Sequence, residues 1–271
     1  MALGLLALAL GGCLGPMHDG RRAMVRGEFE VAARHFRQAA EEHPDDPHPW
    51  LALGRAEMAA ERYPRARDAF TTLARLRPHA ALPRVLIGNT WELQRRYDEA
   101  LLAYRHATQA APRSAYAFRV MGTRLLRWGR AELAIPPLAH AVQLDPSHAE
   151  TWNALAMARY HAGEVEAAQA TFREGLRRHP THDGLRLGLA AVLINAHELE
   201  DALAIYGELV HDRPQFAPAH VGRALLLHEL GREDEAEDAF ETAVRVARDP
   251  RPYQQRLEAY RALRAEAHRD L

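Results

Sequence analysis

Small and large apolar residues recur along this chain with a period of 34 residues. The clearest copy, AETWNALAMARYHAGEVEAAQATFREGLRRHPTH, runs from Ala149 to His182, and its frame fits six other places without insertion or deletion. We number the positions of each repeat from 1 to 34 and the repeats from 1 to 7 in chain order. The repeats start near residues 13, 47, 81, 115, 149, 183 and 217.

Four columns of the repeat are nearly constant in character. Position 8 is always Gly or Ala, position 20 is always Ala, and position 24 is always a large apolar or aromatic residue. Position 32 is proline in every repeat except the last, where Arg248 stands. Small residues let two antiparallel helices approach closely, the residue at position 24 fills the space beside them, and proline ends the second helix. Each repeat therefore predicts a helical hairpin, with helix A over about positions 2–14 and helix B over about positions 18–30.

These columns resemble the tetratricopeptide-repeat family, whose signature places Trp, Leu-Gly, an aromatic residue, Ala, Phe and Pro at 34-residue spacing. The resemblance covers residues 17–250. It implies an all-α fold, a right-handed α-solenoid of tandem helix-turn-helix repeats. In that family the helix A residues line a concave groove, and stacking of neighbouring repeats supplies the core.

Departures from the pattern predict irregular helices. Pro16 and Asp19 occupy positions 4 and 7 of repeat 1, so its helix A should be short and frayed. Pro136 and Pro137 fall within helix B of repeat 4, and interior proline disrupts a helix by about 3 kcal/mol or more. We therefore expect that helix to begin late, near Ile135. Glycine at position 15 of four repeats suits a helix C-terminus and turn.

Residues 251–271 continue the frame as a predicted C-terminal capping helix. Position 8 is Glu258, a carboxylate where every repeat has Gly or Ala, which indicates that no further helix packs there. Helical spacing predicts that Leu257, Tyr260, Leu263 and Ala267 face inward.

Residues 1–16 form a segment that resembles a signal peptide. Its apolar run is too short to span a bilayer, which needs about 20 residues, but it matches the apolar region of a signal peptide. The run ends in LGGC, which resembles a bacterial lipobox and implies lipidation at Cys13. Leu14, rather than Asp, follows the cysteine, which in such lipoproteins implies an outer-membrane location on the periplasmic face. No Lys or Arg precedes the run, so the alternative is a short apolar helix packed on repeat 1.

Composition narrows the function classes. The 271 residues are 48% hydrophobic and 26% charged with a net charge of -1, as in ordinary soluble globular proteins. Charges are interspersed, so we expect no nucleic-acid partner. The single cysteine excludes disulfides within the chain and thiolate metal sites. No nucleophile elbow, metal-binding motif or phosphate-binding loop is present, so we expect no enzyme activity, cofactor, metal or small-molecule substrate.

The family resemblance also suggests groove residues, because positions 2, 5, 9, 12 and 13 of helix A tend to face the groove. Asparagines there can pair with a peptide backbone, and arginine can pair with a carboxylate. The alternative is that each side chain is merely solvated. The chaperone-type carboxylate clamp is absent, since Thr123, Ala154, Gly184 and Gly188 stand where it needs asparagine or basic residues. The polar candidates are Arg55, Asn89, Arg119, Thr123, Asn153, Tyr160, His161, Asn195 and His228.

These features predict a non-enzymatic protein-interaction scaffold. The first interpretation is that the protein is an outer-membrane lipoprotein that binds a protein partner during envelope, secretin or type IV pilus assembly. In this interpretation its architecture resembles that of the pilotin lipoproteins. Lipoprotein adaptors for peptidoglycan enzymes share the same plan. A soluble cytoplasmic adaptor or regulator is the alternative from a different class.

Overall fold

The computed structural model describes residues 15–267, which form fifteen α-helices and no strand. The predicted all-α fold is confirmed for these residues, while Cys13 lies outside them. The helices are α1 (Pro16–Val25), α2 (Phe29–Glu42), α3 (Pro47–Ala59), α4 (Tyr63–Leu76), α5 (Ala81–Leu93), α6 (Tyr97–Ala110), α7 (Ala115–Arg127), α8 (Ala131–Leu144), α9 (Ala149–His161), α10 (Val165–Arg178), α11 (Asp183–Asn195), α12 (Leu199–Asp212), α13 (Ala217–Glu229), α14 (Glu233–Val246) and α15 (Arg251–Ala267).

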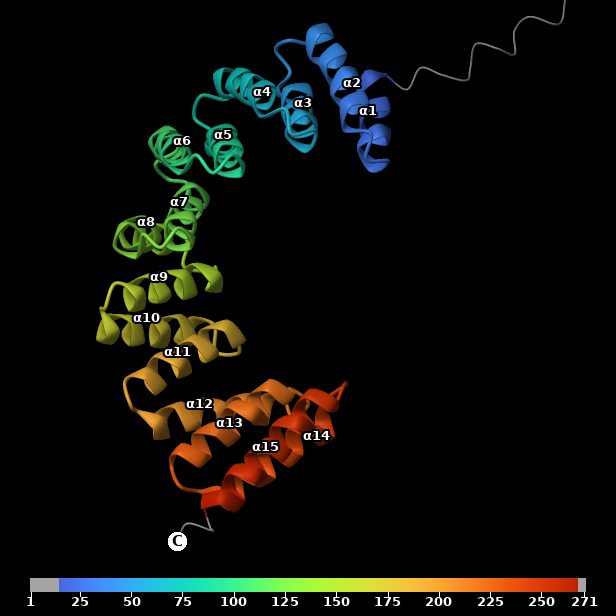
Figure 1. Ribbon diagram of the computed structural model, residues 1–271. Coiled ribbons are helices and arrows are strands. Elements are labelled where there is room, and N and C mark those ends of the chain that lie inside the picture. Colours follow the sequence, from blue (N-terminus) through green and yellow to red (C-terminus); the bar gives the residue numbers. More distant parts are fainter. Residues whose placement is uncertain (1–14, 268–271) are drawn as a thin grey trace, which may run out of the picture. The chain divides into compact units, whose positions relative to one another are not determined.

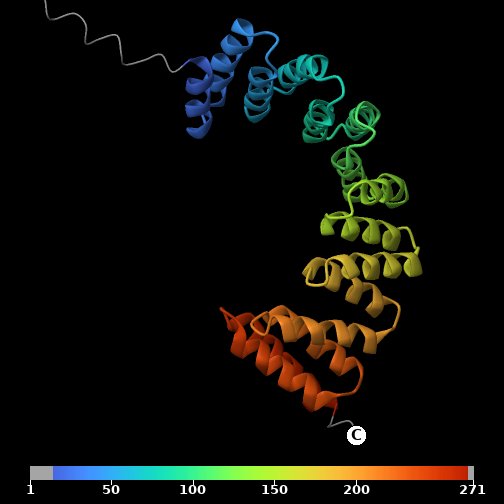
Figure 2. The same cartoon turned by 180° about the vertical axis from the view of Figure 1, so that it is seen from behind.

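Each repeat forms the expected hairpin. In repeats 2 to 7, helix A covers positions 1–13 and helix B covers positions 17–30, within one residue of the sequence prediction. The chain divides into two compact parts, Met1–Met121 and Gly122–Leu271. Within each part, consecutive helices pack side by side as an α-solenoid (Figures 1 and 2).

The turn between helices A and B always has one residue in the left-handed region, at position 15. Gly27 and Gly163 adopt φ values of 75° and 83° there. Glycine suits this conformation because it has no Cβ, and its predicted role is confirmed. In repeats without this glycine, Glu61, Arg95 and His197 adopt φ values of 58°, 58° and 60°. Packing of the two flanking helices therefore imposes the turn conformation even on residues that are strained by it.

The core of each hairpin is a large side chain from helix B resting on helix A. In repeat 2, a Cβ added at Gly54 would lie 2.3 Å from the ring of Phe70. The same relation joins positions 8 and 24 in repeats 1, 3 and 4. Position 8 of repeat 5 is alanine, and there the ring of Phe172 lies against Gly188 of the next repeat. In the first six repeats the large side chain thus packs against a glycine of helix A, either in its own repeat or in the next.

Repeats 2, 5 and 7 are also tied to the repeat before them by a hydrogen bond from position 4 to the proline at position 32. Trp152 Nε1 donates to the Pro146 carbonyl at 2.9 Å. In repeat 7 a buried histidine replaces the tryptophan, and His220 Nε2 lies 2.8 Å from the Pro214 carbonyl. Because the carbonyl can only accept, the proton lies on Nε2 of this histidine. The proline that ends one helix B therefore also positions the next helix A.

Helix α8 does not begin near Ile135, so that prediction was wrong. It runs from Ala131 to Leu144 with both prolines inside. The two missing N–H groups would have bonded to the carbonyls of Glu132 and Leu133, four residues earlier. Both of these residues are exposed, so solvent can satisfy their carbonyls. The prolines also lie in the second turn, where few helical hydrogen bonds precede them.

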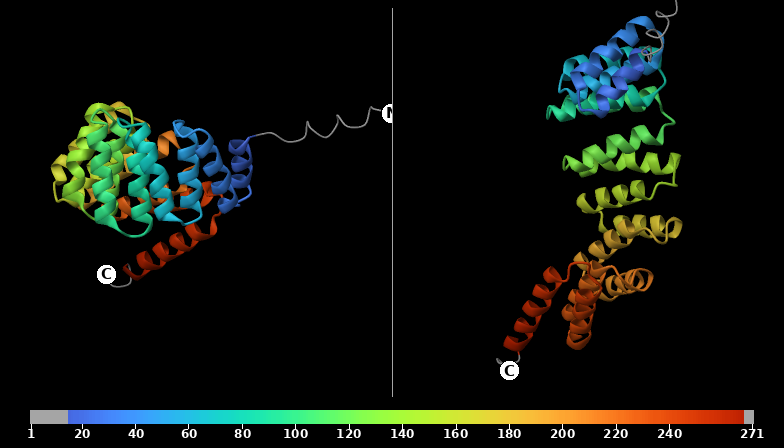
Figure 3. Two further views of the ribbon diagram at one scale, coloured as in Figure 1. Left: turned by 90° about the horizontal axis from the view of Figure 1, so that it is seen from above. Right: turned by 90° about the vertical axis from the view of Figure 1, so that its right-hand side faces the viewer.

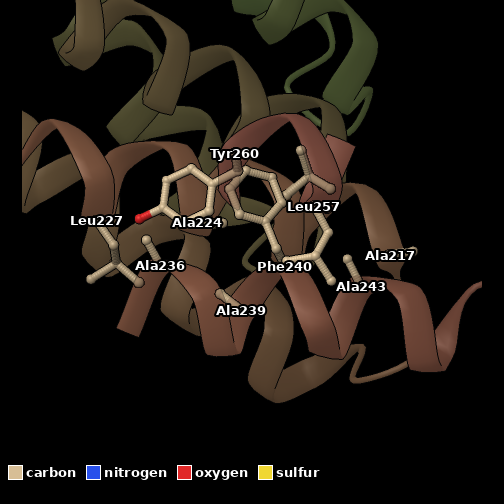
Figure 4. Packing of buried hydrophobic residues seen from close by; sticks show 10 residues of the cluster. Ala217, Ala224, Leu227, Ala236, Ala239, Phe240, Ala243, Leu257 and Tyr260 are labelled. Carbon is tan, nitrogen blue, oxygen red and sulfur yellow. The ribbon is translucent and has the colours of Figure 1, made fainter. Parts of the chain in front are cut away.

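The two ends of the solenoid are partly as expected. Helix α1 is short because Pro16 begins it at position 4. In α15, Leu257 and Tyr260 are buried against α13 and α14 beside Phe240 (Figure 4), and Glu258 is exposed. Leu263 is 53% exposed, so the prediction that it faces inward was wrong. Helix α15 packs against α14 (Figure 3). Leu263 follows Leu257 by six residues, which turns its side chain about 120° around the helix from the buried Leu257.

Within residues 15–267, no helix has the length and apolar character needed to cross a lipid bilayer.

Candidate partner-binding grooves

The predicted groove residues of the N-terminal part have different roles in the structure. Arg55 is exposed and lines a cavity of about 300 Å³ between α1 and α3. Asn89 is half-buried and accepts a hydrogen bond from the Tyr104 hydroxyl at 2.8 Å. Arg119 lies with its guanidinium carbon 5.8 Å from the ring centre of Tyr116. Only Arg55 among these three lines a described cavity.

The predicted groove residues of the C-terminal part also vary. Thr123 and Asn153 are half-buried. The rings of Tyr160 and His161 lie 5.5 Å apart. Asn195 is exposed but donates to the Ala191 carbonyl of its own helix at 2.8 Å, which engages part of its amide.

The cavity at Arg55 is lined by both basic and apolar side chains. The basic ones are Arg21, His48 and Arg55, and the apolar ones include Met17, Met24 and Leu51. Methionine adapts to varied shapes, which suits a surface that contacts a side chain of a partner.

The C-terminal part holds a larger and more apolar groove. A cavity of about 550 Å³ lies between α13 and α15, and a second of about 400 Å³ lies between α13 and the α11–α12 hairpin. Leu225 lines both of them and is 53% exposed. Leu263, equally exposed, lines the larger cavity. We call this surface over α11, α13 and α15 the terminal groove.

The polar ends of two side chains in the terminal groove, His228 and Tyr260, are both engaged by Glu233. His228, a predicted groove residue, places Nδ1 2.9 Å from the carboxylate of Glu233. The Tyr260 hydroxyl donates to the same carboxylate and, at 3.1 Å, to the Glu233 carbonyl. The hydrogen bond from Tyr260 lowers the pKa of Glu233, and His228 lowers it further. Burial, together with the bond to Glu233, raises the pKa of Tyr260 to about 12.

Three of the four arginines of α15 pair with carboxylates. Arg261 and Arg264 bind Glu237 of α14 at 2.6 and 2.8 Å, whereas Arg251 binds Asp249, in the segment between the two helices, at 2.9 Å. Arg256 is exposed, lines the terminal groove, and pairs with no carboxylate among the described residues. It is therefore the arginine of α15 that remains available to a ligand.

Sequence reasoning missed Leu225 because it considered only polar residues at the groove positions. Leu225 stands at position 9, the column that also holds Arg55, Asn89 and Thr123. The signal was present, since position 9 changes from arginine in the first repeats to leucine in the last. Leu263 was missed for a different reason, because helical spacing alone placed it in the core.

A further cavity, of about 420 Å³ between α2 and α4, contains a buried carboxylate with a structural role. Glu57 is fully buried and forms an ion pair with Arg37, and its second oxygen lies 4.0 Å from Arg62. Arg62 also binds Glu30 of the preceding repeat. Two arginines thus neutralise Glu57 and join repeats 1 and 2.

Comparison with solved structures shows the same fold in other proteins. The chain is 13% identical to the C-terminal part of a TPR repeat-containing protein from Cytophaga hutchinsonii, with a TM-score of 0.67 and coverage of 85% of this chain and 95% of that one. For a tetratricopeptide repeat protein from Parabacteroides merdae the identity is 12%, the TM-score 0.55 and the coverage 90% and 97%. For MamA the identity is 24%, the TM-score is 0.54, and the match covers 59% of this chain and 94% of that one.

Family models give the assignment. Models described as tetratricopeptide repeat match residues 20–81, 51–115 and 119–183, and a second such model matches residues 165–220 and 193–265. No curated protein matches the chain. The matched segments span most of the chain and coincide with the helical hairpins, and so this protein belongs to the tetratricopeptide-repeat family.

Proposed function

We propose that this protein is a non-enzymatic scaffold that binds a protein partner through the terminal groove. One observation carries the proposal: Leu225 and Leu263, each 53% exposed, stand beside a cavity of about 550 Å³. Clustered exposed apolar side chains beside a cavity are typical of interaction sites. The tetratricopeptide fold supports the same function, because its stacked repeats present extended binding surfaces.

We further propose that the scaffold is anchored in the outer membrane through a lipid on Cys13 and acts in envelope, secretin or type IV pilus assembly. The support is the LGGC sequence, in which the only cysteine of the chain follows an apolar run. More than one acyl chain on a single residue is sufficient for stable anchoring. An adaptor for peptidoglycan enzymes would have the same anchor and the same groove.

Fractionation of cells that express Cys13→Ala tests the anchor. We expect the wild-type protein in the outer-membrane fraction and the variant in the soluble periplasmic or cytoplasmic fraction. If the variant stays with the membrane, the lipid anchor is wrong. If the wild-type protein is soluble in the cytoplasm, the protein is instead a cytoplasmic adaptor.

Site-specific photocrosslinking tests the groove. A photoreactive residue in place of Leu225 should crosslink to one discrete protein in cells, whose identity separates a secretin from a peptidoglycan enzyme. Leu133 is the matched control, since it is 54% exposed on the helix B α8 of the same part of the chain. Equal crosslinking at both positions, or none at Leu225, would exclude the terminal groove as the partner site.

A further inference from the structure

The terminal groove has two cavities that flank the exposed edge of one helix. Leu225 of α13 lines both, with volumes of about 550 and 400 Å³ on its two sides. Ile194, Leu199 and Tyr206 contribute to the smaller cavity, and Ala259 and Leu263 contribute to the larger one. The groove therefore offers two apolar pockets with Leu225 as the ridge between them.

The spacing of the pockets limits what can fill both. Packed helices lie about 8–10 Å apart, so two pockets on either side of α13 are separated by about that distance. A helix rises 1.5 Å per residue, and side chains at i and i+7 lie on the same face about 10.5 Å apart. An extended chain covers a similar distance in about three residues.

The polarity of the groove favours the helix over the extended chain. An extended peptide needs partners for its N–H and C=O groups, because burying these groups without partners is unfavourable. The polar ends of His228 and Tyr260 are engaged by Glu233, which leaves few groups in the larger pocket for such bonds. A helix satisfies its own backbone and presents only side chains.

Charge gives the bound helix a direction. Arg256 lines the larger pocket without a carboxylate partner among the described residues. Glu229 lines the smaller pocket and is exposed. An acidic residue is thus favoured at the α15 end of the groove and disfavoured near Glu229.

We propose that the terminal groove binds an amphipathic helix of a partner protein, which inserts apolar side chains at i and i+7 into the two pockets and places a carboxylate beside Arg256. This proposal rests on the proposed scaffold function and adds the class of the partner segment. In helix-in-groove recognition, apolar side chains at helical spacing on the bound helix insert into the groove.

A designed peptide pair tests the anchor spacing. The probe is a fluorescein-labelled, 18-residue helical peptide with leucines at i and i+7 and glutamates flanking one of them. Its isomer has the same composition with the leucines at i and i+5, which lie on different faces of a helix. We expect the full-length protein to bind the probe at least tenfold more tightly than the isomer in fluorescence anisotropy. Equal affinity for the two peptides would overturn the proposal.

Matched variants test the location and the direction. Leu225→Glu should weaken binding of the probe at least tenfold, whereas Leu133→Glu, equally exposed on α8, should not change it. Arg256→Glu should weaken binding, and a probe with arginines in place of the glutamates should restore it. Loss of binding in the Leu133 control, or failure of the charge reversal, would overturn the proposal. Circular dichroism confirms that each variant is folded.

The peptide and crosslinking experiments separate the two proposals. If Leu225 crosslinks to a partner while no designed helix binds, the scaffold function stands and the helical class is wrong. If Leu225 neither crosslinks nor affects peptide binding, both proposals fail.

Discussion

The ring of Tyr206 in repeat 6 lies against Gly222 of repeat 7, where an added Cβ would come within 2.3 Å of the ring. In the first four repeats the equivalent side chain rests on a glycine of its own repeat. Repeat 6 has Ala190 at that position, and glycine appears instead at position 6 of the next repeat. The large side chain therefore forms part of the hairpin in some repeats and part of the contact between repeats in others.

We expect Gly222→Ala to lower the free energy of unfolding by about 1–3 kcal/mol, because the new methyl group overpacks the Tyr206 ring. Gly207→Ala is the control. It is also inside a helix, but an added Cβ there meets nothing within 4 Å. Alanine should stabilise that helix by about 0.5–1 kcal/mol. Urea denaturation measures both, and a neutral Gly222→Ala would show that the ring moves aside without loss.

Arg95 adopts the left-handed conformation that glycine holds in other repeats. That conformation costs a residue with a Cβ about 1–2 kcal/mol, whereas glycine adds about 0.5–1 kcal/mol of unfolded-state entropy. We therefore expect Arg95→Gly to raise the free energy of unfolding by about 0.5 kcal/mol. Arg95→Ala removes the same side chain but keeps the strain, and it should not stabilise. Equal melting temperatures for the two variants would contradict the role of strain.

The hydrogen bond from Tyr260 to Glu233 should make the stability of the capping helix α15 depend on pH in the acid range. This bond is the main cause that lowers the pKa of Glu233 in the folded protein. A carboxyl with a depressed pKa contributes stability above its unfolded pKa of about 4.3, and this is lost as the pH falls through the folded pKa. We expect Tyr260→Phe to cost about 1 kcal/mol at neutral pH and less in acid.

Tyr253→Phe is the control for this effect, since Tyr253 lies on the same helix and its hydroxyl has no hydrogen bond among the described residues. Its effect on stability should be small and independent of pH. Denaturation at pH 7 and below pH 4 compares the two variants. A Tyr260→Phe penalty that grows in acid would show that Glu233 is not the group responsible.

His220 replaces the tryptophan that donates to the preceding proline carbonyl in repeats 2 and 5. His220→Phe removes the donor and leaves the Pro214 carbonyl without it, at an expected cost of about 1 kcal/mol. His220→Trp keeps a ring N–H in the same register and should retain more stability than the phenylalanine variant. Thermal denaturation decides between them, and a phenylalanine variant as stable as the tryptophan variant would mean that the bond contributes nothing.

The sequence predicted the hairpins well because their signals are local and repeated. The turn at position 15 and the proline at position 32 mark the helix ends, and in repeats 2 to 7 every boundary except the start of α8 was right within one residue. Pro136 was misjudged because the penalty for a proline depends on whether the carbonyl four residues earlier is exposed. That exposure follows from packing and not from the local sequence.

The terminal groove depended on tertiary structure more strongly. Helical spacing predicted that Leu257 and Leu263 lie on one inward face of α15, but six residues turn a helix so that these two side chains point about 120° apart. Leu257 is buried and Leu263 is 53% exposed. The family resemblance predicted that position 9 faces the groove, yet leucine there could equally have been buried under a neighbouring helix. Exposure of Leu225 is decided by how α13 and α15 pack.

The sequence by itself determined the period, the fold class and, in repeats 2 to 7, every helix boundary except the start of α8, because the turn and small-residue signals are local and repeated. Tertiary structure alone decided which apolar side chains remain exposed and which arginine lacks a partner. Those properties depend on how α13, α14 and α15 pack, which results from contacts between residues that are not neighbours in the sequence. Leu225, Leu263 and Arg256 become a site only through that packing.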